Sequence, residues 1–214
     1  MRRVMRYGLM ACGVVMAASL SVSAQAPASR PASPAGVASA QVSGAWVKGT
    51  EGDSYKNGKW IDITYGRPLL RGRANIFGSG ADYGKKVRDE APVWRAGANQ
   101  TTKLKTEVAL KIGDKVVPAG EYDVFIDLKE GAWTLILSTW PTQQKYDPKD
   151  TTMLWGSYGY TPDKDVARVP MKMEMLASTV EQLTFGFVDM TATGGRLALS
   201  WDKTMASVAF SVAP

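Results

Sequence analysis

Apolar and polar side chains alternate with a period of two along most of this chain. Ile61, Ile63 and Tyr65, for example, are separated by Asp62 and Thr64. Because successive side chains of a strand point to opposite faces, each such run places one face against a core and the other toward water. The pattern recurs at residues 108–112, 122–128, 171–175, 183–187, 197–201 and 208–212. These runs predict antiparallel strands.

Turn-forming residues separate the runs. Gly113, Gly131 and the pair Gly194-Gly195 lie between apolar segments, and such residues favour tight reversals of the chain. No window of about 12 residues carries a helical stripe. The pattern therefore predicts an all-β protein with a single antiparallel β-sandwich or jelly-roll-like domain. The more continuous apolar run at 133–137 is typical of a central strand, and the connections 78–102 and 141–152 are long for this class.

The first 24 residues have the layout of a secretory signal peptide. Arg2, Arg3 and Arg6 precede an apolar stretch, and small residues follow it up to residues 24 and 26. We expect cleavage after residue 24 or 26, and therefore an exported protein, periplasmic or extracellular, without a transmembrane segment in the mature chain. The residues before Cys12 resemble a lipoprotein box, but the stretch that separates Cys12 from Arg6 is too short for that role. We therefore assign Cys12 to the signal peptide.

The segment 25–43 consists almost entirely of Ala, Pro, Ser and Gly. Such a composition buries little apolar surface, which predicts a flexible tether ahead of a β-sandwich domain at 44–214. Removal of residues 1–24 would lower the formal net charge from +6 to +3, because this segment carries three arginines and no acid. A charge of this size is ordinary, so we expect no nucleic-acid partner.

The chain contains no histidine, and its one cysteine lies in the predicted signal peptide. A mature protein without these residues has no disulfide, no Ser-His-Asp or Cys-His catalysis, and none of the usual ligands for zinc, copper or non-haem iron. Met171, Met173 and Met175 are soft ligands of the copper(I) type, but their alternation predicts a core face. We therefore expect no metal site and no cofactor.

Glycosidase chemistry needs two carboxylates and no histidine, so a carboxylate-dependent hydrolase stays open. The candidate acids are Glu51, Asp53, Asp62, Asp123 and Asp127. No spacing among them singles out a pair, and acids on the exposed face of a strand account for most of them. No catalytic residue is assigned.

The segment 63–102 combines arginines with glycines, aromatic residues and amides. Arginine beside glycine and tryptophan can act as a rigid donor fork for carboxylate, phosphate or sugar oxygens, while asparagine and threonine add amide and hydroxyl groups. Buried arginines also lock loops onto a β-sandwich through carboxylates and backbone carbonyls, and both interpretations stay open. The candidate ligand-binding residues are Tyr65, Arg67, Arg73, Trp94, Arg95, Asn99 and Thr102.

The same segment carries a recognisable order of motifs. It reads Tyr65-x-Arg67-Pro68, Gly72-Arg73, Ile76-Phe77-Gly78 and Val93-Trp94-Arg95-x-Gly97-Ala98-Asn99-x-x-Thr102, and Pro118-Ala119-Gly120-x-Tyr122, Trp155-Gly156 and Leu199-x-Trp201 follow later. Over residues 55–212 the chain resembles an exported bacterial domain-of-unknown-function family, family 2911. The resemblance implies a signal peptide and one β-rich domain, and it implies no activity. Asn75 and the expanded loop 85–92 depart from the signature.

We favour a non-catalytic exported binding module over an enzyme. It would recognise an anionic small molecule or a glycan through Arg67, Arg73, Arg95, Asn99 and Thr102, which requires the three arginines to converge on a concave surface. The alternatives are a carboxylate-dependent hydrolase acting on glycosides, with two acids roughly 5 or 6.5–9.5 Å apart, and a protein-protein interaction domain. The sequence predicts neither the ligand nor the oligomeric state.

Overall fold

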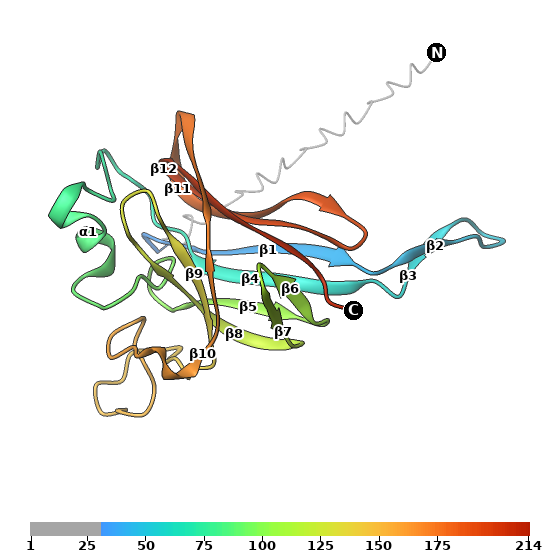
Figure 1. The fold of residues 1–214 in the computed structure, drawn as a ribbon, viewed down its shortest axis with the longest axis horizontal. Helices are drawn as coiled ribbons and strands as arrows, with labels where there is room; N and C mark the ends of the chain where they lie inside the picture. The colour runs from blue at the N-terminus through green and yellow to red at the C-terminus, as the bar shows by residue number, and fades with distance from the viewer. Residues whose placement is uncertain (1–30) are drawn as a thin grey trace, which may run out of the picture. The chain divides into compact units, whose positions relative to one another are not determined.

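The computed structural model describes residues 31–214 as two antiparallel sheets that pack together (Figure 1). The signal-peptide prediction for 1–24 and the start of the predicted tether lie outside these residues. The strand order of the larger sheet is β1 (Ala35–Val42), β4 (Lys59–Gly66), β5 (Thr102–Thr106), β8 (Gly120–Asp127), β9 (Thr134–Ser138) and β10 (Asp165–Pro170). The order of the smaller sheet is β11 (Lys172–Thr191), β12 (Gly194–Val212), β6 (Leu110–Ile112) and β7 (Lys115–Val117). The all-β sandwich prediction is confirmed.

The core lies between the two sheets and follows the period-two pattern. Ile61 and Ile63 of β4 are fully buried, as are Leu183 of β11 and Leu199 of β12. Each such side chain stabilises the fold by about 1.5–3 kcal/mol relative to exposure. β9 lies between β8 and β10 and is buried along nearly its whole length, so the prediction of an interior strand at 133–137 is confirmed.

Strand β1 falls inside the predicted tether, so that prediction is wrong for residues 35–42. β1 pairs with β4 over its full length, from Ala35 opposite Gly66 to Val42 opposite Lys59. It is an edge strand, and its backbone hydrogen bonds need no large side chains. Two small residues, Ala40 and Val42, are enough to bury its inner face. The tether was predicted from the scarcity of large apolar side chains, and β1 does not need such side chains.

The predicted methionine row at the start of β11 is only partly on the core. Met171, just before the strand, is 7% exposed, whereas Met175 is 89% exposed. The pairing with β12 is regular from Lys172 to Met175 and shifts only after it, since Met175 lies opposite Thr204 and Val180 lies opposite Asp202. Residues 176–179 therefore form a large bulge against β12, and Met175, although in register with Met173, lies at the border of that bulge.

Both long connections lie at one end of the sandwich. The connection between β4 and β5 contains the 3-10 helix η1 (Gly80–Asp82) and the short helix α1 (Lys85–Arg88), and the connection after β9 ends in η2 (Pro162–Lys164). The second connection covers part of the outer face of the larger sheet, where Phe125, Ile136, Leu154 and Tyr160 form a small separate core. At this end, therefore, loop residues pack on both faces of the larger sheet.

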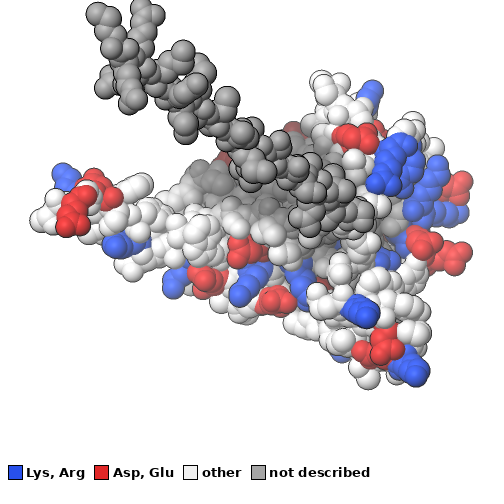
Figure 2. All heavy atoms as spheres, turned by 180° about the vertical axis from the view of Figure 1, so that it is seen from behind, with Lys and Arg blue, Asp and Glu red and all other residues white. Residues whose placement is uncertain are grey.

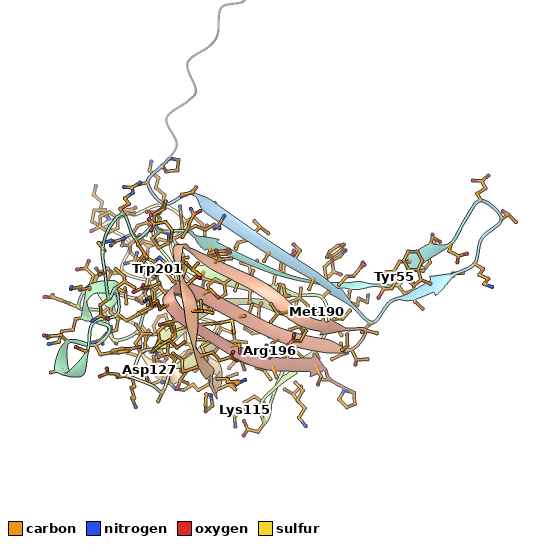
Figure 3. The ribbon with its side chains drawn as sticks, turned by 90° about the horizontal axis from the view of Figure 1, so that it is seen from above. Tyr55, Lys115, Asp127, Met190, Arg196 and Trp201 are labelled. Atoms are coloured by element: carbon orange, nitrogen blue, oxygen red, sulfur yellow. The ribbon has the colours of Figure 1, made fainter. Side chains whose placement is uncertain are left out.

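The opposite end carries a projecting hairpin, β2 (Ala45–Val47) and β3 (Ser54–Lys56) (Figure 1). Ser43 and Asn57 at its base have positive φ angles of 63° and 60°, which bend the β1–β4 hairpin where β2 and β3 begin. Trp46 is 70% exposed and packs edge-on against Tyr55. Figure 3 shows Tyr55 on this hairpin and Trp201 at the loop-bearing end.

Candidate functional site

Arg67 and Tyr65 join the end of β4 to β11. Arg67 Nε donates to the carbonyl oxygen of Leu183 (3.2 Å), and its Nη2 donates to Thr184 Oγ1 (3.2 Å). The Tyr65 ring packs edge-on against Phe185, with centroids 5.0 Å apart. Tyr65 is 6% exposed. These two candidate residues therefore hold one sheet to the other.

Trp94 and Thr102 fix the turn that follows the long loop. Trp94 is 1% exposed, and its amide N–H and carbonyl form a two-way bridge with Ile126 of β8 (2.9 and 2.8 Å). Thr102 is fully buried and its Oγ1 donates to the Ala96 carbonyl oxygen (3.0 Å). The turn passes so close to β4 that a Cβ on Gly66 would lie 1.9 Å from the Ala98 carbonyl oxygen. Both candidates are structural.

Arg73 lies in a different place, on the rim of a wide cleft. Its Nε and Nη2 donate to the carbonyl oxygens of Leu70 (2.9 Å) and Leu69 (2.6 Å), and its guanidinium carbon is 5.9 Å from the ring centroid of Trp201. The cleft has a volume of about 610 Å³, and we call it the Arg73 cleft. It is lined by Leu70, Gly72, Arg73, Ala74, Asn75, Phe77, Gly78, Tyr83, Glu130, Met175, Thr179, Glu181, Asp202, Lys203 and Thr204.

Three carboxylates of this cleft were missed in the sequence. Glu181 Oε1 accepts the Arg71 N–H (2.8 Å), Glu130 Oε2 accepts the Gly80 N–H (2.8 Å), and Asp202 Oδ2 accepts the Ile76 N–H (3.4 Å). They come from β11, the β8–β9 turn and β12, so nothing in the loop sequence marks them. Each anchors the 70–83 loop with one oxygen. Figure 2 shows basic and acidic side chains close together at the end opposite the β2–β3 hairpin.

Arg95 is positioned by both long connections. Its Nη1 donates to the Asn99 carbonyl oxygen (2.8 Å), and its guanidinium carbon lies 5.9 Å from the Trp155 ring centroid and 5.5 Å from that of Tyr158. A Cβ on Gly156, whose φ is +63°, would lie 2.3 Å from the guanidinium carbon. Burial lowers the pKa of Arg95, while Tyr158 and Asp89 oppose that effect. Within residues 31–214, Arg95 has no carboxylate at ion-pair distance.

Asn99 turns away from that guanidinium. It has a positive φ of 63° and its Nδ2 donates to the Ser33 carbonyl oxygen (3.0 Å). It lines a smaller groove of about 260 Å³ together with Tyr65 and Lys103. The hydrogen-bond and ring partners of Arg67, Arg73 and Arg95 are thus all different. The three predicted arginines do not form one site.

A family comparison covers most of the described residues. A sequence family described as a protein of unknown function (DUF2911) matches residues 50–210. The chain belongs to this family. The DUF2911 match includes the Arg73 cleft, Arg95 and both long connections, and it excludes β1 and β2. No curated protein and no solved structure matches the chain.

The acids considered in the sequence occupy unrelated positions in this DUF2911 domain. Asp62 accepts a hydrogen bond from Ser39 Oγ (2.6 Å), Asp123 contacts Lys103 Nζ (3.1 Å), and Asp127 contacts Arg168 (3.2 Å). Asp123 and Asp127 are four residues apart on β8, which separates them by roughly 13 Å. Glu51 and Asp53 lie in the exposed turn of the β2–β3 hairpin. None of these contacts joins two of the five acids.

Residues 31–214 contain no group of three or more Asp, Glu, His or Cys side chains that could hold a metal ion. No helix in this range is long and apolar enough to cross a membrane.

Proposed function

We propose that this chain is an exported, non-catalytic binding domain that holds a small hydroxyl-rich ligand, such as a saccharide, in the Arg73 cleft. The observation that carries the proposal is the cleft itself. Its volume of about 610 Å³ falls within the roughly 300–1,000 Å³ that small-molecule sites occupy. It lies in loops and at a strand bulge, where binding residues are typically placed on a rigid scaffold.

The lining favours hydroxyl groups over a highly charged ligand. Arg73 and Lys203 bring two cations, while Glu130, Glu181 and Asp202 bring three carboxylates, so a polyanion would meet as much repulsion as attraction. A sugar hydroxyl both donates and accepts, which suits donors and acceptors placed side by side. Leu70, Phe77 and Met175 add apolar surface for the carbon face of a sugar ring.

The proposal is tested by calorimetric titration of the full chain with a panel of neutral, amino and acidic saccharides. Arg73→Ala should weaken binding of the tightest saccharide by about tenfold or more, because Arg73 supplies charge-assisted hydrogen bonds in the cleft. Arg71→Ala is the matched control. Arg71 lies in the same loop and is exposed, but it is not among the residues that line the cleft. Equal affinities of the two variants would contradict the proposal.

One observation favours a second candidate, a carboxylate-dependent glycoside hydrolase. Glu130, Glu181 and Asp202 line one cleft, and two facing carboxylates are sufficient for that chemistry. The variants Glu130→Gln, Glu181→Gln and Asp202→Asn each retain an oxygen that can accept the anchoring N–H. Under this candidate the wild type would turn over aryl glycosides, and at least one of the three variants would lose turnover by about 100-fold or more. Binding of a saccharide without turnover would leave the first proposal standing.

A further inference from the structure

We infer that Arg95 forms a second binding site, separate from the Arg73 cleft, for an acidic saccharide whose single carboxylate pairs with the guanidinium. None of the residues around Arg95 lines the Arg73 cleft. The inference therefore does not depend on the function proposed for that cleft. It rests on an arginine that is partly buried, held in place and flanked by the half-buried ring of Trp155 and the exposed ring of Tyr158.

Most guanidinium donors of Arg95 have no acceptor among residues 31–214. Within this range Arg95 makes one hydrogen bond, from Nη1 to the Asn99 carbonyl oxygen. By contrast, Arg168 contacts Asp127 and Asp165, and Arg196 contacts Glu174 and Asp189. Burial of a cation is costly unless an anion or several acceptors compensate for it. Arg95 therefore has both the free donors and the desolvation that an incoming carboxylate would exploit.

Asp89, the acid near this site, does not pair with the Arg95 guanidinium. Asp89 Oδ2 accepts the hydroxyl proton of Tyr158 at 2.5 Å, and it is not at ion-pair distance from Arg95. Asp89 and Glu90 both have positive φ angles, 52° and 66°, in the turn after α1. Their charges act on Tyr158, which is next to the guanidinium. Two fixed negative charges disfavour a phosphate dianion and tolerate a monoanionic carboxylate better.

The guanidinium is preorganised by buried hydrogen bonds between the two long connections. Thr101 Oγ1 donates to the Gly156 carbonyl oxygen (2.8 Å), and Ser157 Oγ donates to the Val93 carbonyl oxygen (2.7 Å). Thr101 is 4% exposed and Ser157 is 1% exposed. These bonds fix the backbone on which Arg95 rests at Gly156. A donor that is already oriented loses little entropy when a ligand binds.

The surrounding rings indicate what the carboxylate is attached to. Tyr158 is 37% exposed and Tyr146 is 58% exposed. The Tyr146 ring lies 5.5 Å from Trp155 between centroids, and Trp155 faces Arg95. Exposed tyrosine rings next to a half-buried tryptophan suit the apolar face of a sugar ring. A ligand with one carboxylate and such a face is a uronic-acid type saccharide.

The experiment titrates the full chain by calorimetry with three probes: an oligogalacturonate, its neutral galactose counterpart and sodium acetate. We expect the oligogalacturonate to bind more tightly than the other two by about tenfold or more, since only it offers both the carboxylate and the ring face. Arg95→Ala should remove most of that binding. Arg73→Ala should leave it within about twofold, because Arg73 contributes nothing to this site. Thermal melts of each variant check that the fold is retained.

A second variant separates binding from a structural role. Asp89→Asn removes a negative charge beside the site and should tighten oligogalacturonate binding about two- to fivefold. A purely structural Arg95 would give no such gain. Equal binding by wild type and Arg95→Ala would overturn the inference, as would equal affinity for acetate and oligogalacturonate. If Arg95→Ala is unfolded, Asp89→Asn decides, and an unchanged affinity there rejects the site.

Discussion

Arg67 and Arg95 lie in the same loop-rich segment, yet the fold treats them in opposite ways. Arg67 donates to a carbonyl and a hydroxyl of β11 and so holds the two sheets together. Among residues 31–214, Arg95 makes one hydrogen bond, within its own turn, and its guanidinium lies beside the rings of Trp155 and Tyr158. The difference shows that residue type alone does not identify the arginine that links the two sheets. The partners that distant strands supply identify it.

The strongest way to test this comparison is to truncate Arg67. Arg67→Ala removes two hydrogen bonds from a charged donor and the packing of its aliphatic stem against Gly36. We expect the free energy of unfolding to fall by about 2–3 kcal/mol, measured by urea denaturation. Arg71→Ala, an exposed arginine nearby, should change it by no more than about 0.5 kcal/mol. Similar losses in both variants would show that Arg67 is not a structural link.

A smaller effect is expected at the glycine that supports Arg95. Gly156 has φ +63°, and a Cβ there would lie within 2.6 Å of three guanidinium atoms. Gly156→Ala should cost about 1–2 kcal/mol of stability from backbone strain, and it should also displace Arg95 and weaken binding of the acidic saccharide. Gly131→Ala is a suitable control, since it has φ +72° and open space around its Cβ. If both variants bind the acidic saccharide with equal affinity, the position of the guanidinium does not depend on its contact with Gly156.

Arg95 itself should matter less for stability than Arg67. Arg95→Ala loses one hydrogen bond to a backbone carbonyl and relieves the cost of a partly buried cation. These two changes oppose each other, so we expect the free energy of unfolding to fall by no more than about 1 kcal/mol. Urea denaturation beside Arg67→Ala measures the contrast. A loss as large as that of Arg67→Ala would place Arg95 among the structural arginines.

Most of the fold could be predicted because alternation reports burial directly. The run 61–65 lies in β4, whose inner residues Ile61, Ile63 and Tyr65 are buried. In β8, by contrast, both faces are buried from residue 122 to residue 126, because the connection after β9 packs on its outer face. The alternation pattern did not predict burial correctly in two further places. Strand β1 consists mostly of small residues and depends on backbone pairing with β4. Met175 is exposed although it alternates regularly with Met173, and it borders the bulge at which the register of β11 on β12 shifts. The position of such a bulge depends on the partner strand.

The candidate site was predictable only as a set of residue types. Arg73 and Arg95 do reach a cleft and an aromatic surface, but their neighbours come from far along the chain. Glu181 and Asp202 lie on β11 and β12, and Trp155 and Tyr158 lie in the connection after β9. Their proximity follows from the strand order, which the sequence does not reveal. The same reasoning explains why the three arginines, close in sequence, diverge in space.

Asp123, unlike Arg95, has an oppositely charged partner within residues 31–214, namely Lys103. It is 3% exposed and contacts Lys103 Nζ at 3.1 Å and Thr142 Oγ1 at 2.9 Å. Burial raises the pKa of the Asp123 carboxyl above its ordinary value of 3.8, against the attraction of Lys103. The folded protein therefore holds this proton more tightly than the unfolded chain does. Its contribution to stability is greatest below pH 3.8 and is lost as the pH rises through the raised pKa.

Asp123→Asn has no proton to lose at this position, and its amide oxygen can still accept the Thr142 hydroxyl. The stability of the wild type relative to this variant should therefore decline as the pH rises from about 3.5 toward neutrality. Urea denaturation of both proteins across that range measures the difference, and the other carboxylates cancel because both proteins share them. Glu121, 3.2 Å from Lys103 Nζ, remains to pair with the lysine in the variant. A difference that grows with pH would mean that Lys103 outweighs burial, and that Asp123 belongs with the paired surface acids.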